Sequence, residues 1–183
     1  MISRAHKSGG ARRPRNERGS QLLELALALP FMLVFAVGIF DFGGAYNLKQ
    51  RISNAAREGA RFAISQSKLD LGDSPPASIL ATRNAVANYL TNAGLTNCAF
   101  ATTAPVKTTG KVEWTISPKT TCVLKIDRGN TTITSGGTAL DSTQVTVTYP
   151  VTWTFNKIMG LLVHGSNPTL PTSITSVTFM RNI

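Results

Sequence analysis

Glu24 is the side chain whose position most needs a chemical explanation. It is the single charged residue in an otherwise apolar run from Leu22 to Phe40. A carboxylate at the centre of a membrane-spanning helix costs about 2.5 to 3.5 kcal/mol, and less near one end, and such groups normally have a partner. The sequence therefore predicts a cation close to Glu24, near the start of the apolar run.

Residue types that commonly carry catalysis or bind metals are sparse. Two cysteines, Cys98 and Cys122, and two distant histidines, His6 and His164, do not make up a usual four-ligand zinc site. The sequence has no Gly-x-Ser-x-Gly elbow, no His-Glu-x-x-His pair and no phosphate-binding glycine-rich loop. We therefore expect no enzyme, no cofactor and no bound metal. An active site without such motifs would require a pocket with converging titratable groups.

The apolar run that carries Glu24 is long enough to cross a membrane. Its nineteen residues, at a helical rise of about 1.5 Å each, cover about 28 Å of the roughly 30 Å hydrocarbon layer. The chain has a net charge of +10, and half of that excess lies in residues 1–18. Basic residues favour the cytoplasmic side of a span. We expect a single pass with the amino terminus in the cytoplasm, and a charge that requires no nucleic-acid partner.

Three alternatives for the same region stay open. A secretory signal peptide also joins a basic part to an apolar part, and Gly43-Gly44-Ala45 offers small residues for its cleavage. The apolar run is longer than the about 7 to 15 residues typical of such signals. The basic leader would also suit a nucleic-acid arm, and residues 22–40 would suit a buried core helix, although the run is apolar on all faces.

An apolar stripe follows the span. Residues three and four apart recur in it, as expected for one face of a helix: Leu48, Ile52, Ala55, Gly59 and Phe62. Alanine and glycine within the stripe permit close approach. One interpretation is that the stripe seats a neighbouring helix, and the other is that it packs on the chain's own globular domain.

A second helix and two strands are predicted beyond the stripe. The helix is expected to start after Pro75-Pro76 and to end near Asn92-Ala93-Gly94. From Lys111 onward the apolar period changes to two, which predicts strands at 112–116 and 122–126. Asp127-Arg128-Gly129-Asn130 then has the composition of a hairpin turn.

The strongest strand signal covers residues 145–155, where six apolar residues alternate with polar ones. Pro150 within it predicts an edge position, a bulge or a break. A short helix is expected at 156–163 and a last strand at 176–181. Helices followed by strands predict an α+β domain with an antiparallel sheet against which the long helix packs.

Cys98 and Cys122 are both predicted to lie on the far side of the membrane, which is an oxidising compartment. We therefore expect a disulfide, and closing a loop of this length contributes ~3 kcal/mol in the chain-entropy model. The alternative is a pair of buried free thiols, which a thiol titration of the denatured, unreduced protein distinguishes.

Gly19, followed five positions later by Glu24 at the start of an apolar helix, resembles a type IV prepilin processing site. The resemblance implies that a membrane aspartic peptidase, the prepilin peptidase, cuts after Gly19 and leaves Ser20 as the new amino terminus. The α-ammonium of Ser20 would then be the cation for Glu24, in the same chain or in a neighbour.

Residues 19–63 as a whole resemble the amino-terminal signature of the TadE-like proteins. The resemblance is carried by Leu-Pro in mid-span, by Asp41-Phe42-Gly43 at the exit of the span and by Ala55-Ala56-Arg57-Glu58-Gly59-Ala60-Arg61 beyond it. These proteins are minor pilins, or pseudopilins, of the tight-adherence (Tad) machinery that builds Flp-type pili.

The resemblance implies a structural role at the bacterial inner membrane. The expected organisation is a cleaved leader at 1–19, a transmembrane helix at 20–46, an amphipathic continuation at 47–68 and an exported domain at 69–183. The implied partners are the prepilin peptidase, other pilin-like subunits and Tad assembly-platform proteins, with homo- or hetero-oligomers formed through the helix. The alternative from another class is a secreted binding module or adhesin with a conventional cleaved signal peptide.

Overall fold

The computed structural model describes residues 17–72, 74–135, 138–157 and 170–182. A very long helix, α1 (Glu17–Ser65), is followed by a 3-10 turn, η1 (Leu69–Gly72), and a second helix, α2 (Ala77–Asn92). A further 3-10 turn, η2 (Phe100–Thr102), leads into the strands. These are β1 (Val106–Lys107), β2 (Glu113–Lys119), β3 (Cys122–Ser135), β4 (Thr138–Pro150) and β5 (Ser173–Arg181).

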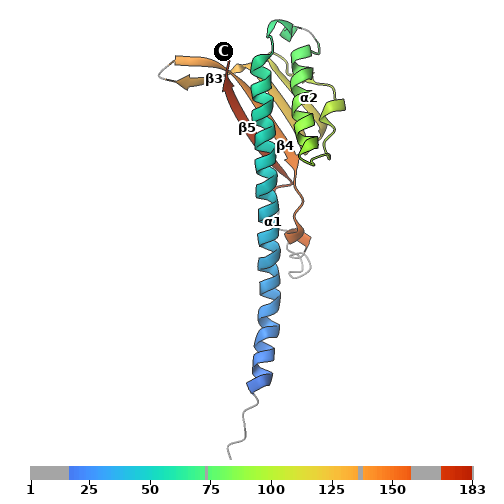
Figure 1. Cartoon of the computed structure of the whole chain (residues 1–183), viewed down its shortest axis with the longest axis vertical. Helices are drawn as coiled ribbons and strands as arrows, with labels where there is room; N and C mark the ends of the chain where they lie inside the picture. The colour runs from blue at the N-terminus through green and yellow to red at the C-terminus, as the bar shows by residue number, and fades with distance from the viewer. Residues whose placement is uncertain (1–16, 73, 136–137, 158–169, 183) are drawn as a thin grey trace, which may run out of the picture.

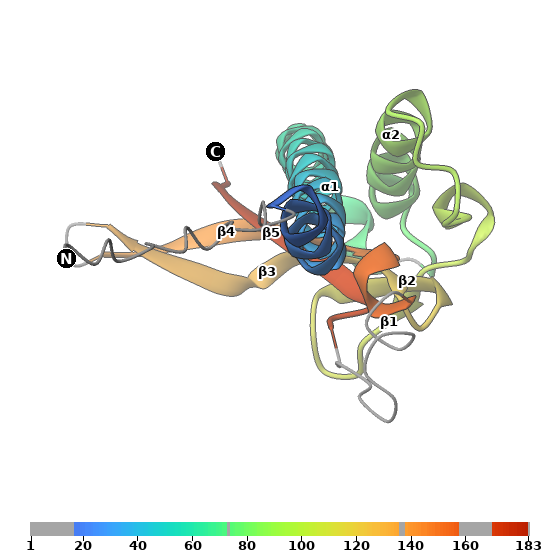
Figure 2. The same cartoon turned by 90° about the horizontal axis from the view of Figure 1, so that it is seen from below.

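The five strands form one sheet in the order β1-β2-β3-β4-β5, and every neighbouring pair is antiparallel. The second half of α1 and the whole of α2 lie on the same side of this sheet (Figure 1, Figure 2). The far end of the β3–β4 hairpin projects beyond both helices. The predicted α+β class, with an amino-terminal helix packed on an antiparallel sheet, is confirmed.

α1 is much longer than the domain it belongs to. Its 49 residues span about 73 Å at a rise of about 1.5 Å per residue. Its amino-terminal half extends past the sheet (Figure 1), and its most apolar stretch is not buried by any of the described residues. Pro30 lies inside this half and does not end the helix. α1 therefore has a docked half and a projecting half.

The core lies between the two helices and the sheet. On β4 the buried side chains Val145, Val147 and Tyr149 are 0–2% exposed, and they alternate with half-buried threonines. This period of two directs one face of the strand at the helices. The rest of the core comes from α1 (Ile52, Ala55, Ala56, Ala60), α2 (Ile79, Val86, Ala87, Leu90), η2 (Phe100), β2 (Trp114, Ile116) and β3 (Cys122, Leu124, Ile126).

Gly59 is the point where α1, α2 and β4 come closest together. A Cβ placed on Gly59 would lie 2.4 Å from Cγ2 of Val86 and 3.4 Å from Cγ1 of Val145. The first distance is far inside van der Waals contact, and the branched valine on α2 has little rotamer freedom to withdraw. A glycine at this position therefore allows the two helices to approach each other over the sheet.

The hairpin turn predicted at Asp127-Arg128-Gly129-Asn130 is wrong, because β3 runs straight through these residues. The pairing of β3 with β4 shifts register between Asp127 and Thr131, so the strand takes up the irregularity as a bulge instead of turning. The chain reverses between the paired residues Ser135 and Thr138. The two residues between them in the sequence are Gly136-Gly137, a composition that favours two-residue hairpins.

β4 as a whole lies between β3 and β5. Pro150 itself pairs only with Ser173 of β5, because the pairing with β3 ends at Thr148, and of the three alternatives predicted for Pro150 a bulge is not seen. β4 ends at Pro150, which has no N–H with which to continue the ladder. Val151, Trp153 and Phe155 therefore lie beyond the strand despite their alternation. Residues 154–157 are helical, and the remainder of the short helix predicted at 156–163 lies outside the described residues.

Cys98 and Cys122 are joined in a disulfide. Cys122 is fully buried at the start of β3, and Cys98 is half-buried in the segment that follows α2. The bond ties the carboxyl-terminal side of the second helix to the middle of the sheet.

The close approach at Gly59 predicts that Gly59→Ala destabilises the domain by about 1 to 3 kcal/mol, despite a helix-propensity gain of about 1 kcal/mol. Chemical denaturation of the full chain in detergent micelles, followed by circular dichroism, measures this loss.

Gly43→Ala is the matched control, because a Cβ at Gly43 in the same helix has no atom within 4 Å. It is expected to cause no loss of stability. Equal effects of the two substitutions would contradict the packing role of Gly59.

Candidate functional site: the projecting half of α1 and its junction with the sheet domain

The residues of the predicted processing site lie in the first turns of α1. Gly19, Ser20 and Glu24 are all exposed, and a Cβ at Gly19 would have no atom within 4 Å. Ser20 and Glu24 are four residues apart, which places them on the same side of a helix. Among the residues that the structure describes, no cation pairs with Glu24. An amine delivered at this end of the helix would therefore meet an accessible carboxylate.

The apolar side chains of the projecting half are uncovered. Phe35, Ile39 and Phe40 are 72%, 72% and 80% exposed, and the other large apolar residues from Leu22 onward resemble them. Within the described residues, α1 is the one helix long and apolar enough to cross a membrane, and none of its most apolar stretch is buried against the protein. A continuous apolar surface of this length requires lipid or other apolar helices to cover it.

The junction between the two halves of α1 is held by the segment that follows β4. The carboxylate of Asp41 accepts a hydrogen bond from the backbone N–H of Phe155 at 2.6 Å. The ring of Phe42 packs edge-on against Trp153, with centroids 5.8 Å apart. The indole N–H of Trp153 donates to the carbonyl of Pro171 at 2.6 Å. The sequence placed Trp153 and Phe155 in a strand and missed this contact with the helix.

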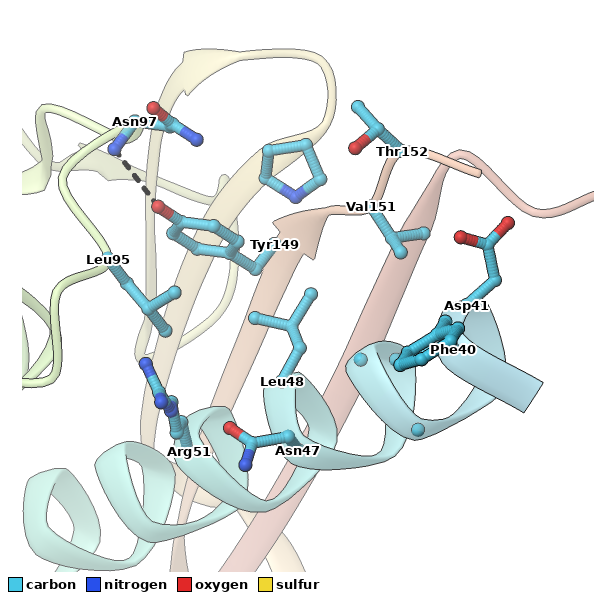
Figure 3. Close-up of a pocket in the computed structure, with 14 residues that line it drawn as sticks. Phe40, Asp41, Asn47, Leu48, Arg51, Leu95, Asn97, Tyr149, Val151 and Thr152 are labelled. Carbon is cyan, nitrogen blue, oxygen red and sulfur yellow. Dashed lines mark hydrogen bonds between the residues drawn. The ribbon is translucent and has the colours of Figure 1, made fainter. Parts of the chain in front are cut away.

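A cavity of about 530 Å³ lies beside the junction, between α1, the segment after α2 and the end of β4 (Figure 3). Asp41, Arg51 and Tyr149 are its titratable side chains, and each already bonds to backbone. Arg51 donates to the carbonyl of Ala93 at 2.7 Å, and the Tyr149 hydroxyl accepts from the N–H of Asn97 at 2.9 Å. Burial raises the pKa of Tyr149. These groups bond to separate backbone partners and do not form an acid–base pair.

The family motif after the span divides into a buried and an outer set. The buried set consists of the small residues Ala55, Ala56, Gly59 and Ala60. The outer set consists of Arg57, Glu58 and Arg61. Arg61 and Glu58 form an exposed ion pair at 3.4 Å. The motif therefore supplies a thin apolar face toward the domain and a charged face toward the outside.

The predicted helix-packing stripe faces the chain's own domain. Ile52, Ala55 and Gly59 are buried, and Leu48 and Phe62 are half-buried. α1 contacts α2, β4 and β5 along this half. The role of the stripe in seating a second chain stays a prediction, and the projecting half offers the larger uncovered surface for that purpose.

The Arg128 side chain bonds to the chain just after the carboxyl-terminal end of α1. The sequence did not single out this residue. Its side chain is 1% exposed, and its guanidinium donates to the carbonyls of Gln66 at 2.7 Å and Ser67 at 2.9 Å. These carbonyls belong to the two residues that follow the helix, so the cation lies next to the negative end of the helix dipole and bonds the chain just beyond it. The signal in the sequence is that Arg128 continues the buried phase of Leu124 and Ile126.

Asp70 supports the same corner. Its carboxylate accepts hydrogen bonds from the backbone N–H of Ser78 at 2.6 Å and from the Ser78 hydroxyl at 2.8 Å, at the start of α2. Partial burial raises the pKa of Asp70, but the Ser78 hydrogen bonds and the nearby Arg128 outweigh it and lower the pKa below its usual value. Arg128 and Asp70 together connect the end of α1 to the start of α2.

These features define a class of protein: an α+β domain carried on one amino-terminal helix that could span a membrane. Within the described residues, no group of three or more His, Cys, Asp or Glu side chains could hold a metal ion. Residues 19–61 match the family model for TadE-like proteins. This match confirms the resemblance to TadE-like proteins seen in the sequence, over this segment of the chain.

The match ends within the docked half of α1, so the sheet domain lies outside it. Neither a curated protein nor a solved structure matches the chain.

The two carbonyl contacts of Arg128 predict that Arg128→Met destabilises the domain by about 1.5 to 3 kcal/mol, because two partly buried hydrogen bonds from a charged donor are lost. Arg128→Lys should recover only part of the loss, since an ammonium lacks the planar fork. Denaturant unfolding of the full chain in micelles measures both. Arg57→Met, at an exposed position on α1, is the control and should shift stability by less than about 0.5 kcal/mol. An Arg128→Met variant with the same free energy of unfolding as the wild type would contradict the role proposed for Arg128.

The lowered pKa of Asp70 predicts that this carboxylate stabilises the fold at neutral pH and ceases to do so as the pH falls through its lowered folded-state pKa. The stability difference between wild type and Asp70→Asn should therefore be constant above about pH 5 and shrink below about pH 4. Unfolding curves recorded from neutral to acidic pH test this. A difference that stays unchanged at acidic pH would count against the proposed bonding.

Proposed function

We propose that this chain is a membrane-anchored minor pilin, or pseudopilin, that takes part in the assembly of Tad (Flp-type) pili. The TadE-like segment suggests involvement in Tad pilus assembly. The observation that carries the proposal is the continuity of α1: an uncovered apolar half leads directly into a half that is built into the sheet domain. Such a helix can lie in a membrane, or among similar helices, while it carries a folded domain outside.

In this proposal α1 crosses the bacterial inner membrane once, with residues 1–19 in the cytoplasm and the sheet domain in the periplasm or outside the cell. Its partners are other pilin-like subunits and Tad assembly-platform proteins, which it meets through the projecting half. The role is structural, and the bonding of Asp41, Arg51 and Tyr149 to backbone groups supports a non-enzymatic role.

We also propose that a prepilin peptidase matures the chain between Gly19 and Ser20. Two observations support this. The segment around Gly19 is exposed and carries no packed contact at the glycine, so a protease can reach it once the first turn of α1 opens. The new α-ammonium of Ser20 would lie one helical turn from Glu24, which lowers the cost of that carboxylate in lipid.

The alternative, a secreted binding module with a conventional signal peptide, predicts a cut after Ala45. This cut would remove Asp41 and Phe42, which bond to Phe155 and pack on Trp153 in the structure. It would also divide a continuous helix just before its docked half. The junction contacts therefore favour retention of the helix.

The maturation proposal predicts that coexpression with the prepilin peptidase removes residues 1–19 and gives a membrane-bound chain that begins at Ser20. Intact-mass measurement with and without the peptidase reads this directly. Gly19→Val should block the cut. Gly38→Val is the control, because Gly38 lies in the same helix and also has no atom within 4 Å of a built Cβ.

A chain that loses everything through Ala45 and becomes soluble would support the secreted module instead. Cleavage of Gly19→Val and Gly38→Val to the same extent would rule out Gly19 as the processing site.

A further inference from the structure

We propose that the segment after β4, residues 151–157, is a second membrane contact whose aromatic side chains enter the lipid–water interface beside the exit of α1. Contact of this segment with lipid is a property additional to the proposed role in pilus assembly. It rests on the proposal above only in that α1 must span a bilayer.

The contacts at the junction determine which residues of α1 lie beside this segment. Phe155 is bonded through its N–H to the carboxylate of Asp41 at 2.6 Å, and Trp153 packs on Phe42 with ring centroids 5.8 Å apart. In Figure 1 the segment leaves the sheet and runs beside α1 toward its projecting half. Trp153 and Phe155 therefore lie at the depth of helix residues 41 and 42.

That depth corresponds to the interfacial layer of a bilayer. The polar layers add about 5 to 7 Å on each side of the hydrocarbon core, which is about three to five helical residues at a rise of about 1.5 Å. With the apolar run from Leu22 to Phe40 in the core, Asp41 to Ala45 occupy this layer. Because residues 151–157 pack beside Asp41 and Phe42, this segment lies in the same layer.

The side chains at this level have the chemistry that the interface favours. Phe42 is 66% exposed within this layer, and Trp153 and Phe155 are half-buried beside it. Phe40 and Tyr46, at the two borders of the layer, are 80% and 67% exposed. Aromatic residues gather at membrane–water interfaces, where an apolar ring meets lipid and a polar atom is satisfied separately. The indole N–H of Trp153 is already satisfied by the Pro171 carbonyl, so its ring can contact acyl chains without losing a hydrogen bond to water.

Cations lie on the side of this aromatic group that faces away from the hydrocarbon. Lys49 and Arg51 are exposed on α1 within about two turns of Tyr46, where they donate to the backbone carbonyls of Thr175 and Ala93. The nearest carboxylate, Asp41, is bonded to backbone. This order of aromatic residues followed by cations fits a surface of anionic phospholipid headgroups.

Depth-dependent quenching of tryptophan fluorescence tests the proposal. The full chain is reconstituted at low protein-to-lipid ratio into phosphatidylcholine–phosphatidylglycerol vesicles whose acyl chains carry bromine near the headgroup or near the terminal methyl. The Trp153→Phe variant keeps Trp114, which is 1% exposed in the domain core. Subtracting the emission of this variant from the emission of the wild type gives the emission of Trp153. We expect near-headgroup bromine to reduce the Trp153 emission at least about twofold, deep bromine to reduce it less, and Trp114 to be unaffected.

A third chain separates this inference from the anchoring that it rests on. Phe31→Trp in the Trp153→Phe background places a tryptophan in the middle of the apolar run, at a side chain that is 69% exposed, and should be quenched most by deep bromine. If that residue is quenched and Trp153 is not, the second contact is overturned and the anchoring stands; this is also the result expected if another subunit covers the segment. If neither residue is quenched, both are overturned.

Discussion

α1 is one unbroken helix that must suit two surroundings, an apolar one around its projecting half and the protein core around its docked half. A helix satisfies its own peptide groups equally well in lipid and inside a protein, so only its side chains decide which surroundings each part requires. Large apolar residues such as Phe35 and Ile39 are uncovered in the projecting half, while the docked half presents Ala55, Gly59 and Ala60 to a packed core. The change from large exposed to small buried apolar residues divides the helix without interrupting it.

The docked half is fixed at both ends, so the helix and the sheet form one body. Near its start, Asp41 bonds the segment after β4, and just beyond its end Arg128 bonds the carbonyls of Gln66 and Ser67. Between these points Gly59 brings α1 against α2 and β4. A displacement of the projecting half is therefore transmitted to the sheet.

Features that depend on periodicity could be predicted from the sequence, and features that depend on single long-range contacts could not. The length of the apolar run, the stripe through Ile52 and the alternation along β4 all reflect neighbours in the chain. The alternation also continued through Trp153, where the aromatic residues face α1 and not the sheet, and the polar residues near Arg128 resembled a turn. In both cases the deciding partner lies more than sixty residues away, at Phe42 and at Gln66.

The central claim is that the mature chain keeps its apolar helix and holds it in a bilayer. Hydrogen–deuterium exchange with mass spectrometry, on chain purified from its own membranes and kept in lipid nanodiscs, tests this most directly. The account predicts that peptides covering residues 22–40 are present and exchange as slowly as the docked half of α1. Their absence from the purified chain, or exchange as fast as that of an unstructured peptide, would contradict it.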